Sequence, residues 1–339
     1  MSGINRRRGK RPGWMVGVIA AAAAGTLFLC AFLIVQAAGK GAAVKTSGSA
    51  LSGDPAVDSA GFGDTILNHG KAYRYNTNLK NILLLGIDKG QSTAAKGIAA
   101  RNGRSDTMIL LTVDCAAKTT RILEISRDTM MNVDVYDAND AFQFSGKMQL
   151  TMQYAFSSSA RRGCWLAAKK VSELLYGVPV DYTVSLTMDG IAPVVDALGG
   201  VKLTVPEDYT SVSPEFRKGA VLELNGRQAF QYVHYRNTAV TGSNDTRMER
   251  QMQFMQAFYR RMNLNGSGST VRKLQDAAEP YLESNLDAEN LQKLIQYRLQ
   301  EKILKVPGKT HRGSSHDEYE VDDGALRQMV ADAFYVPAS

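Results

Sequence analysis

Apolar and polar residues are grouped in short blocks along most of this 339-residue chain, and these blocks predict an α/β fold. Continuous apolar runs are typical of strands that are buried on both faces. They occupy residues 80–87, 107–114 and 119–125. Because residues 114–118 are short enough for a hairpin, the second and third strands should be antiparallel. The predicted sheet is therefore mixed rather than purely parallel.

Helix signals follow these strands, so we expect one α/β domain over residues 77–339, with a mixed β-sheet flanked by helices. Further strands are predicted at 181–188 and 201–205. Helices are predicted at 149–154, 163–176, 189–198, 226–235, 246–262, 271–282, 288–301 and 323–334, and a polar loop at 308–317. Methionines spaced by three and four residues in 246–262 indicate core packing, with an apolar slot for a ligand as the alternative.

The longest apolar stretch lies near the N-terminus. Residues 14–38 contain no charged side chain, and about 20 apolar residues suffice for a transmembrane helix. A signal peptide has a shorter apolar region of roughly 7–15 residues, so we expect a retained anchor, although small residues at 37–38 leave cleavage as an alternative. Five basic residues in the tail, 1–13, place the N-terminus in the cytoplasm. The Gly-, Ala- and Ser-rich segment 39–76 then predicts a flexible extracellular linker.

Charge and cysteine content exclude several classes of protein. The formal net charge of +7 is accounted for by the basic tail together with Lys40 and Lys45, so no nucleic-acid-binding surface is predicted. Three cysteines are too few for a disulfide framework, and Cys115 and Cys164 could either pair or remain buried thiols. The four histidines form no zinc-binding motif.

Candidate chemistry appears at the ends of the three apolar strands. Asp88 follows the first strand, Arg104 and Asp106 precede the second, and Arg127 and Asp128 follow the third. If these strands are antiparallel, Asp88, Arg104, Asp106 and Arg127 reach the same rim of the sheet. Aspartate can hold Mg²⁺ through oxygen, and arginine can bind phosphate bidentately. The rim therefore predicts a site for a metal-bound, multiply charged phosphate.

A second group of basic residues, Arg236, Arg247 and Arg250, lies downstream with Gln251. Arg247 and Arg250 fall in the first turns of a predicted helix, where basic residues oppose the helix dipole. An anion bound at that N-terminus would make the placement favourable. These residues therefore predict a second wall of the phosphate site, although exposed arginines offset by the capping box 246–249 are the alternative.

Eight ordered blocks together resemble the LytR–CpsA–Psr (LCP) family over residues 79–262. The blocks are 81–88, 104–114, 126–129, 146–147, 195–201, 224–229, 232–236 and 247–251. The resemblance implies a phosphotransferase (EC 2.7.8-like) of bacterial cell-wall assembly. Such an enzyme moves a glycopolymer from a polyprenyl (pyro)phosphate carrier to peptidoglycan and forms a phosphodiester link. It also implies an apolar channel for the polyprenyl chain.

Site roles follow from the same resemblance, position by position. It implies Mg²⁺ (or Mn²⁺) held by Asp88 and Asp106. The implied substrate contacts are Arg104, Arg127, Lys147, His234, Arg236, Arg247, Arg250 and Gln251, and the implied catalytic residues are Asp106, Arg127 and Asp128. Asp106 or Asp128 could act as the base. For Asp128 we favour a different role, in which it only orients Arg127.

The chain also departs from the family pattern. Ser126 stands where the family usually has Pro, Asn244 where it often has Asp, and His234 where it usually has Arg. We expect His234 to tune phosphate binding rather than to act as the base. Two other functions fit the residues: an extracellular polyprenyl-pyrophosphate phosphohydrolase with water as the acceptor, and a non-catalytic wall- or lipid-binding regulator. Retention of Asp88 and Asp106 favours catalysis over the regulator.

Overall fold

The computed structural model describes residues 65–68, 71–89, 94–95, 98–99, 102–235, 250, 253–254, 257–258, 261, 273–274, 276–286, 297–314 and 316–338. The predicted tail 1–13, the anchor 14–38 and most of the linker 39–76 lie outside these residues. Within the described part of the chain, no helix has the length and apolar character needed to cross a membrane.

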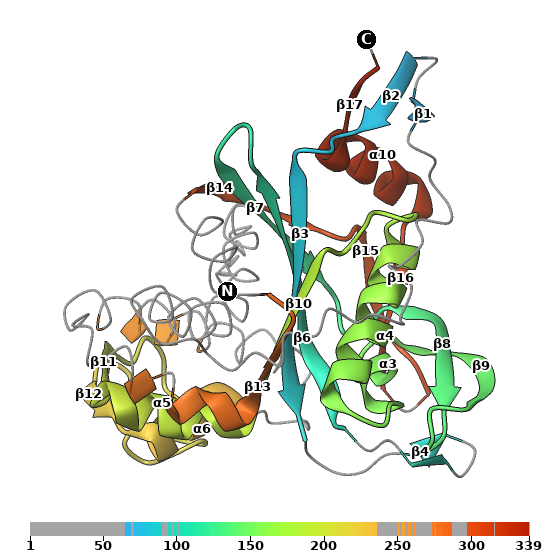
Figure 1. Ribbon diagram of the computed structural model, residues 1–339. Helices are drawn as coiled ribbons and strands as arrows, with labels where there is room; N and C mark the ends of the chain where they lie inside the picture. Colours follow the sequence, from blue (N-terminus) through green and yellow to red (C-terminus); the bar gives the residue numbers. More distant parts are fainter. Residues whose placement is uncertain are drawn as a thin grey trace, which may run out of the picture.

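A six-stranded mixed sheet forms the centre of the molecule, in the order β13-β10-β3-β6-β7-β14 (Figure 1). The strands β3 (Leu79–Asp88), β6 (Arg104–Asp114) and β7 (Thr119–Ile125) are antiparallel neighbours. The outer strands are β10 (Tyr182–Thr187), parallel to β3, β13 (Leu282–Ser284), antiparallel to β10, and β14 (Arg298–Lys305), parallel to β7. The predicted mixed sheet and its hairpin are confirmed.

Both faces of the sheet are covered, which explains the continuous apolar runs. Leu83 and Leu85 pack in one core with α4 (Ala160–Leu174) and α10 (Asp323–Phe334), whereas Ile82 and Leu84 pack in a separate core on the opposite face. Because alternate residues of a strand point to opposite faces, neither set can be polar. In Figure 1, α3 (Met152–Ala155) and α4 lie on one side of the sheet.

A smaller lobe lies beside the lower end of the sheet in Figure 1 and has its own core. It contains η1 (Met188–Gly190), α5 (Ile191–Leu198), β11 (Val201–Thr204), β12 (Val221–Leu224) and α6 (Gly226–His234). Asn225 caps α6 in a reciprocal capping box with Gln228. A Cβ on Gly226 would lie 2.1 Å from the carbonyl oxygen of Ala192, so the contact between α5 and α6 requires glycine there.

The remaining elements are short strands, mostly in two-stranded ribbons, and one 3-10 turn. They are β1 (Thr65–Asn68), β2 (Lys71–Tyr75), β4 (Ala94–Ala95), β5 (Ile98–Ala99), β8 (Met130–Tyr136), β9 (Phe142–Gln149), η2 (Glu279–Tyr281), β15 (Gly308–Arg312), β16 (Asp317–Val321) and β17 (Tyr335–Pro337). The ribbons β8–β9 and β15–β16 matter most here, because both reach the site described below.

Several predicted elements are wrong. The predicted helix at 149–154 is reduced to Met152–Ala155, since Gln149 ends β9. The predicted loop at 308–317 is part of the β15–β16 hairpin, and the predicted helix at 288–301 gives way to β14 from Arg298. By contrast, the strand predicted at 201–205 is confirmed as β11, which pairs with β12. The alternation of apolar and polar residues in Phe142–Gln149 and in Asp317–Val321 is the strand signal that the predictions for these segments missed.

Two further expectations are settled by the described residues. The strands β1 and β2 fall inside the predicted linker, and β2 pairs with β17, so ordered structure begins before residue 77. Cys115 and Cys164 are both free thiols, and burial raises the pKa of Cys164 to about 12.

A buried ion pair joins the β8–β9 ribbon to α4. Lys170 Nζ lies 2.9 Å from both Asp134 Oδ2 and Glu173 Oε2, and its side chain is 6% exposed. Burial alone would raise the pKa of Asp134, but hydrogen bonds from Ser145 and Lys170 outweigh it and the pKa is lowered. Asp134 therefore stabilises the fold fully above its unfolded pKa of about 3.9, and this contribution is lost as the pH falls through the lower folded pKa.

We expect Lys170→Met to lower the free energy of unfolding by about 3–5 kcal/mol, because it leaves the Asp134 carboxylate buried without its cation. The loss of stability in acid that Asp134 contributes should also become smaller, because without Lys170 burial raises the folded pKa of Asp134. Urea denaturation as a function of pH measures both effects. The control is Lys169→Met, whose lysine lies 4.0 Å from Glu173 at the surface and should contribute within about 0.5 kcal/mol. Equal losses in the two variants would contradict the assignment.

Candidate active site

The site begins where β3 ends and β6 begins. Asp88 is directly opposite Arg104, as the antiparallel prediction requires. The register shifts by one residue between Gly86 and Ile87, so that Asp106 is the extra residue of a β-bulge. Bulges bend a strand and redirect its side chains, and they are frequent beside active sites. Gly103, just before β6, has a φ of +81°, a backbone conformation that favours glycine. A Cβ at this position would also lie 2.5 Å from the carbonyl oxygen of Asp88, so only glycine fits here.

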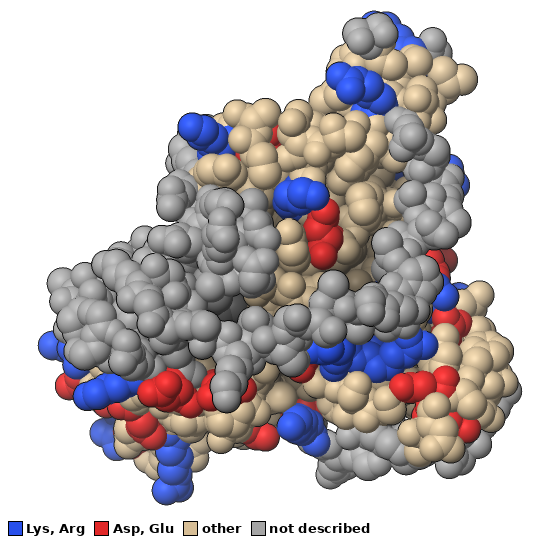
Figure 2. All heavy atoms as spheres, in the orientation of Figure 1, with Lys and Arg blue, Asp and Glu red and all other residues tan. Residues whose placement is uncertain are grey.

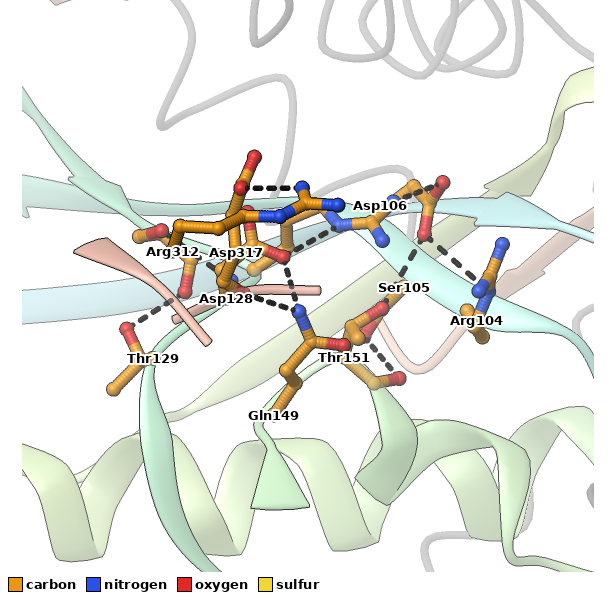
Figure 3. Close-up of polar contacts among 11 residues, drawn as sticks. Arg104, Ser105, Asp106, Asp128, Thr129, Gln149, Thr151, Arg312 and Asp317 are labelled. Atoms are coloured by element: carbon orange, nitrogen blue, oxygen red, sulfur yellow. Dashed lines mark hydrogen bonds and ion pairs between the residues drawn. The ribbon is translucent and has the colours of Figure 1, made fainter. Parts of the chain in front are cut away.

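The side chain of Asp106 contacts residues at the start of β6, after the end of β7 and after the end of β9 (Figure 3). Its side chain is only 4% exposed and forms an ion pair with Arg127 Nη1 through Oδ2. Its other oxygen, Oδ1, accepts a hydrogen bond from Thr151 Oγ1 at 3.3 Å and lies 3.9 Å from Arg104 Nε. The carboxylate is thus surrounded by donors.

Arg127 is held between two carboxylates. In addition to Asp106, its Nε donates to Asp128 Oδ1 at 3.2 Å. Burial alone would lower the pKa of Arg127, but the charges of Asp106 and Asp128 outweigh burial and raise it. The guanidinium is therefore fixed in its charged form with 16% of its side chain exposed. A cation fixed in this way before substrate arrives suits the binding of an anion.

The turn after β7 and the end of β9 hold this pair in place. Thr151 N–H donates to the carbonyl of Arg127 at 3.1 Å, and the carbonyl of Thr151 accepts from Ser105 N–H at 3.3 Å. Ser126 Oγ accepts a hydrogen bond from Asp128 N–H at 3.3 Å. A serine hydroxyl can close such a turn through the N–H two residues on, so the departure from proline at this position still gives a defined turn.

The smaller lobe approaches the site from the other side through His234. This residue ends α6, and its Nε2 lies 3.5 Å from Asp88 Oδ2. Its ring stacks on Phe230, with centroids 4.8 Å apart. Arg250 is 3% exposed, donates from Nε to the carbonyl of Tyr232 at 2.7 Å and also contacts the carbonyl of Tyr235. Arg250 thus satisfies carbonyls at the end of the helix that places His234 beside Asp88.

The other predicted contacts are placed differently. Lys147 lies on β9 opposite Asn132 and lines a cavity of about 410 Å³ together with Glu173, Tyr176 and Asp323. Among the residues that the structure describes, no hydrogen bond or ion pair joins it to Arg104 or Arg127. Arg236, Arg247 and Gln251 lie outside the described residues, and so does most of the predicted Met-rich helix. The buried residues of that helix segment that the structure describes are Arg250, Phe254, Ala257 and Phe258.

Three residues of the site were missed by sequence reasoning: Gln149, Thr151 and Arg312. Gln149 Nε2 donates to Asp128 Oδ1 at 2.6 Å, and Arg312, on β15, pairs with Asp317 beside them (Figure 3). Gln149 and Thr151 fall where a helix was predicted, and Arg312 where a loop was predicted. A correct assignment of the β8–β9 ribbon would have brought Gln149 to the same rim as Asp128.

The donor set fits a magnesium ion. Mg²⁺ is commonly held by one or two carboxylates, with substrate phosphates and water completing its shell. Asp88 and Asp106 supply two carboxylates at one rim. Among the residues that the structure describes, no group of three or more His, Cys, Asp or Glu could enclose a metal by itself. A cation here would therefore depend on these two aspartates and on the phosphate.

Charged side chains of both signs gather in the lower half of the face in Figure 2, where β3 ends and β6 begins in Figure 1. The upper half is mainly uncharged.

Comparisons with known proteins identify several relatives of this chain. The chain is 26% identical over 226 residues to biofilm regulatory protein A of Streptococcus mutans, covering 64% of this chain and 53% of that protein. It is 27% identical over 267 residues to the polyisoprenyl-teichoic acid–peptidoglycan teichoic acid transferase TagV of Bacillus subtilis, covering 77% and 62%. It therefore spans between half and two thirds of these two relatives.

Solved structures share the fold. Protein gbs0355 of Streptococcus agalactiae has a TM-score of 0.56 at 22% identity, over 76% of this chain and 88% of that chain. TagT bound to LI-WTA has a TM-score of 0.52 at 23% identity, over 80% and 95%. The sequence profile of the LytR_cpsA_psr family matches residues 41–333, and the chain therefore belongs to the LytR–CpsA–Psr family.

Proposed function

We propose that this protein transfers a glycopolymer, with its phosphate, from a polyprenyl pyrophosphate carrier to peptidoglycan. The observation that carries the proposal is Arg127, buried and fixed between Asp106 and Asp128 at the rim that also holds Asp88 and Arg104. Membership of the family supports it, as do relatives named polyisoprenyl-teichoic acid–peptidoglycan teichoic acid transferases. We further propose that residues 14–38 anchor the chain, with its catalytic domain outside the cell.

In the proposed reaction, a sugar hydroxyl of the acceptor forms a bond to the phosphorus that carries the glycopolymer. The bond from this phosphorus to the second phosphate of the carrier breaks, the carrier leaves as polyprenyl phosphate, and the hydroxyl proton passes to a base. Arg127 and Arg104 would hold the phosphate oxygens and stabilise the charge that develops on them. Because Arg127 is positioned before substrate binds, little reorganisation would be needed during the reaction.

The metal would be held by Asp88 and Asp106, and when bound it would neutralise charge on the phosphate oxygens. His234, beside Asp88, would tune the binding of the same phosphate from the α6 side. The polyprenyl chain would occupy an apolar channel between the sheet and the helices. The acceptor sugar would be identified from the linked product of the experiment that follows.

The experiment that tests the proposal is incubation of the purified full chain with a lipid-linked glycan, Mg²⁺ and peptidoglycan fragments. A transferase gives a phosphodiester-linked glycan–peptidoglycan product that mass spectrometry identifies. Release of phosphorylated glycan without attachment to peptidoglycan would support the phosphohydrolase instead. Absence of any turnover would favour the non-catalytic wall- or lipid-binding regulator.

Removal of either carboxylate of the metal site should abolish activity. Asp88→Ala and Asp106→Ala should each lower kcat by at least about 10²-fold, the scale of losing one preorganised electrostatic contact. Chelation of the wild-type protein should do the same, and added Mg²⁺ should restore it. The measurement is product formation, with circular dichroism as the check on folding. Unchanged turnover in both variants would remove the metal from the proposal.

Arg127→Lys keeps the positive charge but loses the planar fork that can bind two oxygens at once. We expect kcat to fall by about 10²–10³-fold. The matched control is Arg327→Lys, because Arg327 pairs with Asp323 at 2.8 Å on the exposed face of α10. If the two lysine variants were equally active, Arg127 would have no special role.

His234→Arg restores the residue that the family usually has beside Asp88, so we expect activity to be kept or raised. His234→Ala should weaken substrate binding, seen as a higher KM. Inactivation by His234→Arg, with fold and metal binding intact, would assign His234 to proton transfer.

A further inference from the structure

The β15–β16 hairpin, nearly two hundred residues downstream of Arg127, is docked directly on the site. Tyr319 N–H donates to the carbonyl of Asp128 at 2.9 Å, and Tyr319 forms a parallel bridge with Thr129. Gln149 Nε2 also donates to the carbonyl of Asp317 at 2.9 Å. The end of β9, the turn after β7 and the hairpin therefore meet around Asp128, as Figure 3 shows for Gln149, Asp128 and Asp317.

The side-chain amide of Gln149 is the junction of these three elements. Its nitrogen lies 2.6 Å from Asp128 Oδ1 and 2.9 Å from the carbonyl oxygen of Asp317, so both amide hydrogens have an acceptor. The opposite orientation of the amide would place its oxygen against a carboxylate and a carbonyl, neither of which can donate. The surroundings thus dictate that Gln149 acts here as a double donor.

The same oxygen of Asp128 accepts from both Gln149 and Arg127. An aspartate side chain can rotate about its last torsion, which is broad and has no steep minimum. The short bond from Gln149 restricts that rotation and keeps Oδ1 directed at Arg127 Nε. Without it, Arg127 would retain Asp106 but would lose the second of the two contacts that fix its plane.

We propose that Gln149 is a positioning residue that aligns Arg127 through Asp128 and thereby makes the C-terminal hairpin a working part of the active site. The proposal deepens the proposed function and rests on it for its kinetic consequence. Gln149 itself need not touch the substrate. Its effect should appear in the alignment of Arg127 with transition-state charge more than in the binding of the phosphate, because Arg127 stays charged when Gln149 is replaced.

The test is Gln149→Met, which keeps the length of the side chain and removes both donors. The full chain should lose about tenfold or more in kcat, the scale found when a residue that orients a site group is removed, with KM changed by less than about threefold. Gln143→Met is the matched control. Gln143 lies on the same strand, and its Nε2 likewise donates to a carboxylate, Asp137 Oδ2 at 3.0 Å, and to a carbonyl, Ala141 O at 3.1 Å, away from the site.

A double variant separates positioning from general loss of structure. If Gln149 acts through Asp128, adding Gln149→Met to Asp128→Ala should lower kcat little further, since the residue it orients is gone. Losses that multiply in full would overturn the proposal, and so would wild-type kinetics in Gln149→Met.

The second readout needs no turnover. In the full chain labelled with ¹⁵N at arginine, the Nε–Hε signal of Arg127, identified by its loss in Arg127→Lys, should exchange with water faster in Gln149→Met and at the wild-type rate in Gln143→Met. The signals of Arg162 and Arg327 report whether the fold is intact. An altered Arg127 signal in a chain without transferase activity would keep the positioning role and refute the proposed function. An unaltered signal would overturn the positioning role whatever the activity.

Discussion

The arrangement of this molecule depends on holding one guanidinium out of water. Arg127 is 16% exposed, and burial of a charge is costly unless it is paired and hydrogen-bonded. Two carboxylates meet that cost from different elements: Asp106 from the bulge at the start of β6, and Asp128 from the turn after β7. Each carboxylate then needs donors of its own. Thr151 supplies one to Asp106 and Gln149 one to Asp128, which draws in the end of β9.

The need to pair Arg127 and to supply donors to its two carboxylates explains why segments far apart in the sequence meet at the site. The β8–β9 ribbon is fixed to α4 by the buried Lys170–Asp134 pair, and its last residues deliver Gln149 and Thr151 to the rim. The β15–β16 hairpin is joined to the same turn through Tyr319 and Asp317. The central sheet alone would bring Asp88, Arg104, Asp106 and Arg127 together. The ribbons determine how rigidly they are held.

The parts of the fold that sequence reasoning predicted are those in which burial leaves a mark on the sequence. β3, β6 and β7 are apolar on both faces, and the helix predicted at 323–334 matches α10. The meeting of Asp88, Arg104, Asp106 and Arg127 at one rim followed from the antiparallel order of these three strands alone. The ribbons did not follow: β15 is largely exposed and has no apolar alternation, and β16 is only five residues long, too short for its alternation of Tyr319 and Val321 with glutamates to stand out. Gln149 was lost with them, since no local pattern distinguishes a glutamine that orients an aspartate from one at the surface.

The position of the bulge adds a reason why Asp106 cannot be a simple surface carboxylate. In regular antiparallel pairing, side chains two apart on β6 would both point to the face that carries Asp88. The extra residue breaks that alternation at Asp106 and bends the strand. Arg104 remains opposite Asp88, while Asp106 turns toward Arg127 and becomes almost fully buried. The rim thus has a more exposed part, with Asp88, Arg104 and His234, and a more buried part, with Asp106 and Arg127, and the two meet where Arg104 Nε lies 3.9 Å from Asp106 Oδ1. A phosphate that enters from the more exposed part would meet an arginine whose orientation has already been fixed from behind.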